Sequence, residues 1–229
     1  MAEVIRINES TYRIEDGMVR MYLFIGSKKA ALIDTGMNTP DARKIAEGIT
    51  KLPLVLVNTH SDRDHVSGNA SFSEFYMNIA EEENYRANGG VGTIIPIKEG
   101  DVIDLGDREL YVIDIPGHTP GSVALLDEKN RILVSGDSVQ DGIIFMFGAR
   151  RNIVDFVESL KHLKEFDGRY DDIYPMHGNF PVKPSLIDDL IVGANEIIAG
   201  TAEGSEIDLF GNAVTLYKFP YAGFYGELR

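Results

Sequence analysis

The chain contains no cysteine among its 229 residues. Disulfide bonds, thiolate metal ligands and a cysteine nucleophile are therefore excluded, and any chemistry must rest on other side chains. Histidine is scarce as well, with five in the whole chain. The positions of those few histidines therefore need an explanation.

Positive charge is in deficit. Lysine and arginine number 22 against 36 acidic residues, which gives a formal net charge of -14. A protein that binds nucleic acid through backbone phosphates needs a basic surface, so we expect no nucleic-acid partner. A site for a small anion stays open, because bound metal ions can dominate the local charge.

Long apolar runs are also missing. The first residues, Met1 to Arg6, do not place a basic region before an apolar stretch, and no apolar run approaches about 18 residues. We therefore expect no secretory signal, no membrane partner and a soluble, cytoplasmic protein. With 44% hydrophobic and 25% charged residues and no linker, residues 1–229 are expected to form a single domain with a substantial core.

Strand and helix patterns alternate along the chain, which predicts a layered α/β sandwich. The predicted strands are 19–24, 30–34, 54–57, 75–80, 102–105, 110–115, 123–126, 132–134, 172–176, 207–210 and 213–219. The predicted helices begin at Thr39-Pro40, Glu81, Asn152 and about Leu186, and the last ends at Gly200. Gly211-Asn212 is predicted as a two-residue hairpin turn.

Histidine and aspartate recur where a predicted strand ends. Ligand-type side chains in such positions are His60, Asp62, Asp64 and His65 after 54–57, His118 after 110–115, Asp137 after 132–134 and His177 after 172–176. One such histidine is most simply a hydrogen-bonded residue at a strand end. Four together predict a metal site at one edge of the sheets. His162, on the polar side of its helix, is expected to be only solvated.

The motifs that carry these residues closely resemble those of the metallo-β-lactamase superfamily. They are His-x-Asp-x-Asp-His at 60–65, Gly-His-Thr-Pro-Gly-Ser at 117–122, Ser-Gly-Asp at 135–137, His-Gly at 177–178 and Asp-Thr-Gly at 34–36. The resemblance covers residues 12–200 in the family's order. It implies an α/β fold, a four-layer αββα sandwich of two mixed β-sheets flanked by helices, with metal ions at the edge of both sheets.

The resemblance also implies which residues bind the metals. One ion would be held by His60, Asp62 and His118. The other would be held by Asp64, His65 and His177, with Asp137 bridging both. Asp64 and His177 are the ligands expected to act in catalysis. Asp34 would orient a ligand, although a capped strand end explains it equally well.

Asp62 departs from the usual motif, which has histidine at this position. Two divalent ions with three carboxylates and one hydroxide would be about neutral, whereas a histidine at 62 would leave about one positive charge. The lower charge weakens Lewis acidity, and oxygen ligation favours harder ions. We therefore expect two divalent ions per chain, zinc with iron or manganese as competitors.

The resemblance implies a metal-dependent hydrolase. A metal-bridging hydroxide would attack a small ester, thioester, lactone or phosphate ester. The alternative is a diiron redox or oxygen-reactive protein, because the family's flavodiiron reductases also carry a carboxylate at this motif position; it would need a separate electron donor. A metal-stabilised binding protein without turnover is the third possibility.

Three further segments each allow two or more interpretations. Arg150 and Arg151 precede a helix start, where cations oppose the helix dipole; they either contact an anionic group of a small-molecule substrate or form a solvated pair. Phe145 to Phe147 either line an apolar pocket or pack in the core. The aromatic segment 219–225 overhangs the site, covers a partner in a homo-oligomer or packs on its own domain.

Overall fold

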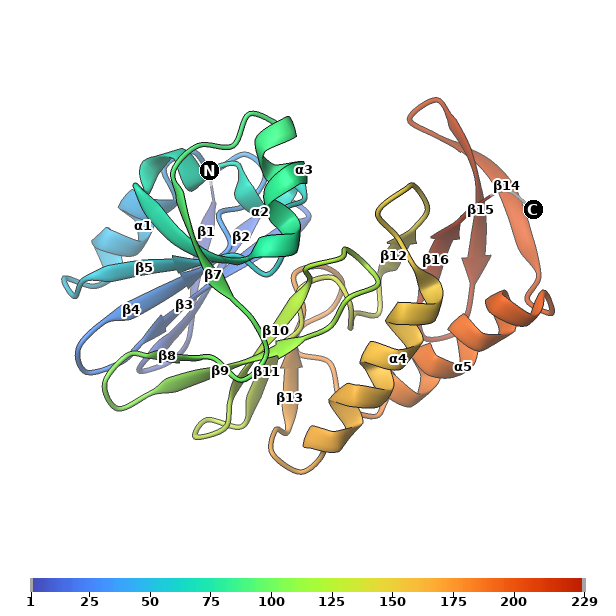
Figure 1. The fold of residues 1–229 in the computed structure, drawn as a ribbon. Coiled ribbons are helices and arrows are strands. Elements are labelled where there is room, and N and C mark those ends of the chain that lie inside the picture. Colours follow the sequence, from blue (N-terminus) through green and yellow to red (C-terminus); the bar gives the residue numbers. More distant parts are fainter. Residues whose placement is uncertain (1, 228–229) are drawn as a thin grey trace.

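Two β-sheets pack face to face in the computed structural model, which describes residues 2–227 (Figure 1). The seven-stranded sheet runs in the order β1 (Glu3–Asn8), β2 (Thr11–Asp16), β3 (Val19–Ile25), β4 (Ala30–Ile33), β5 (Leu54–Val57), β6 (Glu74–Asn78), β7 (Thr93–Ile97). The five-stranded sheet runs in the order β13 (Asp172–Tyr174), β11 (Ile132–Val134), β10 (Val123–Asp127), β9 (Glu109–Asp114), β8 (Val102–Asp104). Both sheets mix parallel and antiparallel pairs.

The core between the sheets is built from side chains of both. Tyr22 and Phe24 of β3 meet Val112 of β9 and Leu125 of β10, all fully buried. The opposite face of β3 is buried as well, under the outer helices, so the strand is apolar on both faces except at Arg20. Each such large apolar side chain contributes about 1.5–3 kcal/mol on burial.

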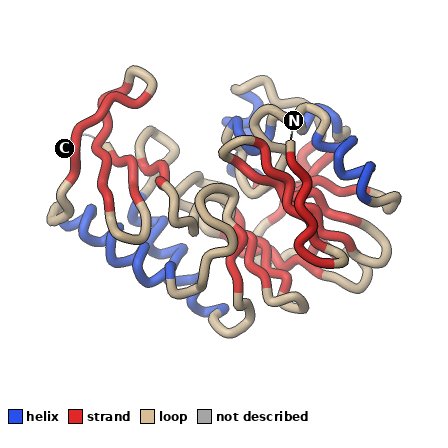
Figure 2. The backbone as a smooth tube through the Cα atoms, turned by 180° about the vertical axis from the view of Figure 1, so that it is seen from behind, coloured by secondary structure: helices blue, strands red, loops and turns tan. Residues whose placement is uncertain are grey.

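Helices cover the outer faces of both sheets (Figure 2). They are α1 (Ala42–Ile49) and α3 (Glu82–Ala87) on the seven-stranded sheet, and α4 (Ile153–Leu163) and α5 (Leu186–Ala199) on the five-stranded sheet. The short elements are α2 (Arg63–Val66), η1 (Asn69–Ser71), η2 (Ile79–Glu81) and η3 (Lys164–Phe166). The predicted αββα arrangement is confirmed. Nowhere in residues 2–227 is there a helix with the length and apolarity needed to cross a bilayer.

The helix boundaries predicted at Asn152, Leu186 and Gly200 are correct, α3 begins one residue after the predicted Glu81, and one boundary is wrong. Asn152 caps α4 by accepting hydrogen bonds from the Val154 and Asp155 amides, and Gly200 ends α5 in the left-handed conformation. The start predicted at Thr39-Pro40 is wrong: α1 begins at Ala42, and the Thr39 carbonyl only accepts a turn bond from the Ala42 amide.

A third sheet packs against α4 and α5, and the sequence predicted its hairpin, 207–210 with 213–219, but not its other two strands. Its order is β12 (Ile143–Met146), β16 (Gly223–Gly226), β15 (Asn212–Lys218), β14 (Gly204–Leu209). The aromatic C-terminal segment therefore packs on its own chain, with Tyr217 and Phe224 buried against the two helices. The predicted turn is one residue out of place. Leu209 pairs with Asn212, so the turn residues are Phe210 and Gly211, both at positive φ.

The strand directions bring the candidate residues together. β4 and β5 are parallel, and β9, β11 and β13 run in one common direction. The segments that follow these five strands carry Asp34, the 60–65 loop, His118, Asp137 and His177. Because the carboxyl ends of parallel strands meet at one edge, the loops converge there.

Candidate metal centre

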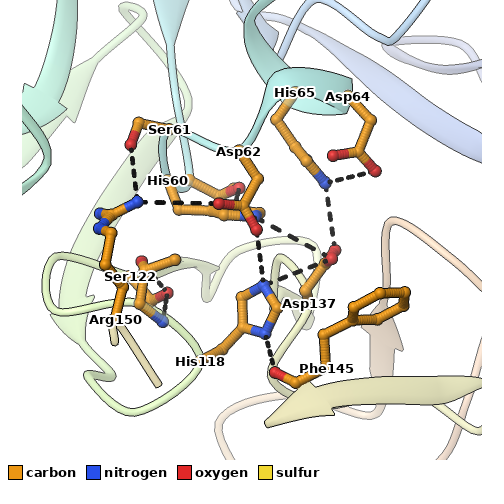
Figure 3. Close-up of polar contacts among 12 residues, drawn as sticks. His60, Ser61, Asp62, Asp64, His65, His118, Ser122, Asp137, Phe145 and Arg150 are labelled. Atoms are coloured by element: carbon orange, nitrogen blue, oxygen red, sulfur yellow. Dashed lines mark hydrogen bonds and ion pairs between the residues drawn. The ribbon is translucent and has the colours of Figure 1, made fainter. Parts of the chain in front are cut away.

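The seven predicted ligand side chains lie in two adjoining groups. One group contains His60, Asp62 and His118, and the other contains Asp64, His65, Asp137 and His177; within each, the ligand atoms lie within 4.8 Å of one another. Asp137 lies between the groups (Figure 3). Its Oδ2 is 3.6 Å from His118 Nε2 and its Oδ1 is 3.4 Å from His65 Nε2. The family resemblance implies that this residue bridges two ions, and that role stays a prediction.

Every histidine of the centre is held through Nδ1. The partners are Thr59 Oγ1 for His60 at 3.0 Å, Asp34 Oδ2 for His65 at 2.9 Å, the Phe145 carbonyl for His118 at 3.1 Å and the Met18 carbonyl for His177 at 2.6 Å. Carbonyl oxygens only accept, so His118 and His177 carry their proton on Nδ1. In the neutral imidazoles that a metal ion requires, their Nε2 atoms are then free to accept, and they face the centre. This is how proteins usually orient metal-binding histidines.

Asp34 orients two of the four histidines. It is fully buried, and its Oδ2 accepts from His65 Nδ1 and from the Thr59 hydroxyl at 2.7 Å. Because the Thr59 hydroxyl donates its proton to Asp34, its oxygen accepts from His60 Nδ1. Asp34 has a φ of 60°, a left-handed backbone conformation that is uncommon for non-glycine residues and that aspartate tolerates better than most.

Several buried polar atoms at the centre have no hydrogen-bond partner. Among the described residues these are His60 Nε2, His65 Nε2, His118 Nε2 and Asp137 Oδ1. One unsatisfied buried polar atom costs about 1–3 kcal/mol. Four that face a common space fit a divalent cation, and imidazole with carboxylate suits zinc, iron and manganese.

Comparisons with known proteins agree with this geometry. The family model described as the metallo-beta-lactamase superfamily matches residues 14–198. The chain belongs to the metallo-β-lactamase superfamily. It is 32% identical over 199 residues to the acyl-coenzyme A thioesterase MBLAC2 of Gallus gallus, covering 69% of this chain and 72% of that protein. The expectation of a metal-dependent hydrolase is thereby confirmed.

Two further matches are a curated hydrolase and a solved structure. A hydroxyacylglutathione hydrolase of Gloeobacter violaceus is 35% identical over 107 residues, covering 45% of this chain and 42% of that protein. The structure of a metallo-beta-lactamase from Pontibacter korlensis superposes with a TM-score of 0.74 at 17% identity, covering 85% of this chain and 99% of that chain. The second match shows a shared fold.

Charge within this metallo-β-lactamase-like centre is tightly coupled. Burial alone would raise the pKa of Asp137, but His177 and His65 hold it well below its usual range. Burial opposes protonation of His177, yet the Asp137 carboxylate raises its pKa to about 10. Burial and then Arg151 lower the pKa of His118, although Asp62 opposes them. The aspartates are therefore ionised at neutral pH and ready to bind cations.

The residue that departs from the family pattern is paired with arginine. Asp62 Oδ2 lies 3.3 Å from His118 Nε2 and accepts from Arg151 Nη2 at 2.5 Å. Arg150 Nη1 is 3.8 Å from Asp62 Oδ1, and its Nη2 donates to Glu81 Oε2 at 2.7 Å. The two arginines are therefore not a solvated pair. Their contact with substrate stays a prediction.

Glu81 was not recognised in the sequence, where it reads as the start of an exposed acidic helix. It is fully buried and accepts from the Ser61 amide at 2.9 Å, the Ser61 hydroxyl at 2.5 Å and the Gly121 amide at 2.8 Å, besides Arg150. It thus ties together the loops that carry His60, His118 and the arginines. Three consecutive glutamates, 81–83, gave no signal that the first one is inside.

Arg20 supports His177 in a similar way. Its guanidinium donates to the carbonyls of Pro175, His177, Gly178 and Asn179, at 3.2, 3.1, 2.5 and 3.3 Å. It fixes the loop after β13 to the hairpin whose Met18 carbonyl accepts from His177. His162 lies outside the centre, and the expectation that it is only solvated is wrong: its Nε2 contacts Glu99 Oε1 at 2.8 Å.

Proposed function

We propose that this protein hydrolyses an acyl thioester. The proposal is carried by one observation: seven histidine and aspartate side chains at the positions of the family's metal motifs lie together in a chain whose relatives include an acyl-coenzyme A thioesterase and a hydroxyacylglutathione hydrolase. In the reaction, the acyl carbon–sulfur bond breaks, the oxygen of water joins the acyl carbon, and the thiol leaves with a proton.

We further propose that the centre holds two divalent ions. His60, Asp62 and His118 would bind one, Asp64, His65 and His177 the other, and Asp137 both. Such ions supply Lewis acidity and a water-derived nucleophile at neutral pH. Zinc, iron and manganese all suit this donor set.

The chain's own residues decide how substrate approaches. His60, His65 and His118 are closed off from solvent, whereas the side chains of Asp62, Asp64 and His177 are 23%, 24% and 21% exposed. The thioester therefore enters from the side of those three residues. Asp64 Oδ2 lies 3.2 Å from His177 Nε2, and we assign Asp64 the proton of the attacking water.

A diiron redox protein is the second candidate, because Asp62 adds a carboxylate to the first group. An iron-oxo absorption band in the purified protein, together with dioxygen consumption when an electron donor is added, would favour it over hydrolysis.

A substrate panel tests the proposal. Acyl-coenzyme A and acylglutathione thioesters, oxygen esters, lactones and phosphodiesters are each assayed with zinc, manganese and iron. We expect the highest kcat/KM for a thioester. His65→Ala should abolish turnover, and His162→Ala, a histidine outside the centre, should keep it. Failure of every thioester with every metal would overturn the proposal.

A further inference from the structure

Three aromatic side chains form a wall beside the metal centre. They are Phe145, Phe147 and Tyr225, called the aromatic wall below. The Phe145 ring lies 4.9 Å from the Tyr225 ring and 5.9 Å from the Phe147 ring, measured between ring centroids. Phe147 and Tyr225 are 6.5 Å apart. The three rings are thus one continuous apolar surface.

The strand pattern turns this surface away from the protein core. Phe145 is paired with Tyr225 between β12 and β16. Their neighbours Ile144 and Phe224 point to the opposite face and are fully buried among α4 and α5. Because side chains alternate between the two faces of a sheet, the aromatic wall lies on the other face, where its rings are only half-buried. Core packing therefore does not account for them.

The segment that carries Phe145 and Phe147 contacts the metal centre at two points, through a main-chain carbonyl and through an arginine side chain. The Phe145 carbonyl accepts from His118 Nδ1 at 3.1 Å (Figure 3). Six residues later Arg151 contacts Asp62 at 2.5 Å. Phe147 lies in the segment between these two contacts. The wall therefore begins beside the reacting centre and extends away from it.

We propose that the aromatic wall binds the acyl group of the thioester and gives the enzyme a preference for apolar acyl chains. The inference rests on the proposed function. An acyl chain starts at the carbon that is attacked, so its first methylenes must lie next to the centre, where the wall begins. Aromatic rings offer large apolar area with little loss of side-chain freedom. The acyl chain of the substrate contacts the aromatic wall, while the thiol part of the substrate lies elsewhere.

The acyl length dependence of turnover tests the inference. The holoenzyme is assayed with acetyl-, butyryl-, hexanoyl- and octanoyl-coenzyme A. Burial of each added methylene should raise kcat/KM by up to about fourfold until the wall is covered. Phe147→Ala should lower the octanoyl-to-acetyl ratio of kcat/KM at least about tenfold. Phe147→Leu, which keeps an apolar side chain, should retain most of that ratio and serves if the alanine variant does not fold.

The matched control is Phe210→Ala. Phe210 is 87% exposed in the turn between β14 and β15, at the edge of the same sheet opposite β12. This variant makes the same chemical change without touching the wall, so its octanoyl-to-acetyl ratio should equal that of the wild type. An equal fall in both alanine variants would overturn the inference.

A binding measurement separates acyl recognition from turnover. Titration calorimetry with S-ethyl- and S-octyl-coenzyme A, thioethers that cannot be hydrolysed, should show tighter binding of the octyl compound to the wild type. Phe147→Ala should remove that difference. An unchanged difference, or a Phe147→Ala variant that changes only the oligomeric state, would overturn the inference while thioester hydrolysis by the wild type stands. A wild type without thioesterase activity would instead overturn the proposed function.

Discussion

Asp34 accepts a hydrogen bond from His65 Nδ1 at 2.9 Å and, through the Thr59 hydroxyl, also fixes His60. One buried carboxylate thus orients one histidine in each ligand group. Asp34→Ala should lower metal affinity about 10- to 100-fold, the usual cost of losing such a partner. Competition with a chromophoric chelator measures it.

Asp16→Ala is the control for that prediction. Asp16 is nearly buried and accepts from the Met37 and Asn38 amides, close to Asp34, but contacts no histidine. The Asp16→Ala variant should have lower thermal stability than the wild type and nearly the same metal affinity. Equal losses of affinity in the two variants would show that Asp34 acts only through the loop backbone.

Glu81→Gln should destabilise the protein by about 1–3 kcal/mol, because a buried group loses its charge-assisted hydrogen bonds. The pair with Arg150 contributes only part of this, since the Arg150 side chain is 26% exposed. Denaturant unfolding measures the change. Glu82→Gln, which removes one exposed partner of Arg86, should change stability by less than about 0.5 kcal/mol.

Arg20→Met should free the loop that carries His177. We expect metal binding by the group containing Asp64, His65 and His177 to weaken about tenfold or more, as for other residues that orient ligands. Metal titration measures it. Arg20 and Arg13 both pair with Glu15, at 3.3 and 2.7 Å. Arg13→Met removes only the second of these pairs and none of the four carbonyl contacts, so the metal affinity of this variant should match the wild type.

Arg151 changes the net charge around Asp62. The carboxylate adds one negative charge relative to histidine, but the guanidinium at 2.5 Å returns a positive one. Asp62→His alone should therefore weaken metal binding, since Arg151 then faces the cations without a partner. Arg151→Gln combined with Asp62→His should restore much of the affinity, with a coupling of about 0.5–3 kcal/mol. Additive effects in the double-mutant cycle would contradict this coupling.

The stability of the metal-free protein should depend on pH because of His177. Its folded pKa is about 10 and its ordinary value 6.5. Protonated His177 therefore stabilises the fold fully below about pH 6.5, and this contribution is lost as pH rises toward 10. The difference in Tm between chelated wild type and His177→Gln should shrink over that range. A difference that is constant with pH would contradict the assignment.

The ligand positions could be predicted because each depends on a local pattern, a polar residue directly after an apolar strand. The roles of Glu81 and Arg20, and the pairing of Arg151 with Asp62, could not be predicted, because the partners are distant in sequence and are set only by packing. The hairpin of the third sheet was predicted, but β12 and β16 were missed for a similar reason, because they are short and pair across 80 residues of chain. The turn was misplaced because Gly-Asn is the more typical turn pair, whereas here Phe210 takes the left-handed conformation. The single domain and the location stay predictions.

The most direct test of the account is the thioesterase activity of chelated protein titrated with a divalent ion, with bound metal measured in the same samples. The account predicts no activity without metal and a rise that saturates at two ions per chain. Hydrolysis that survives full removal of metal, or saturation with a single bound ion, would contradict it.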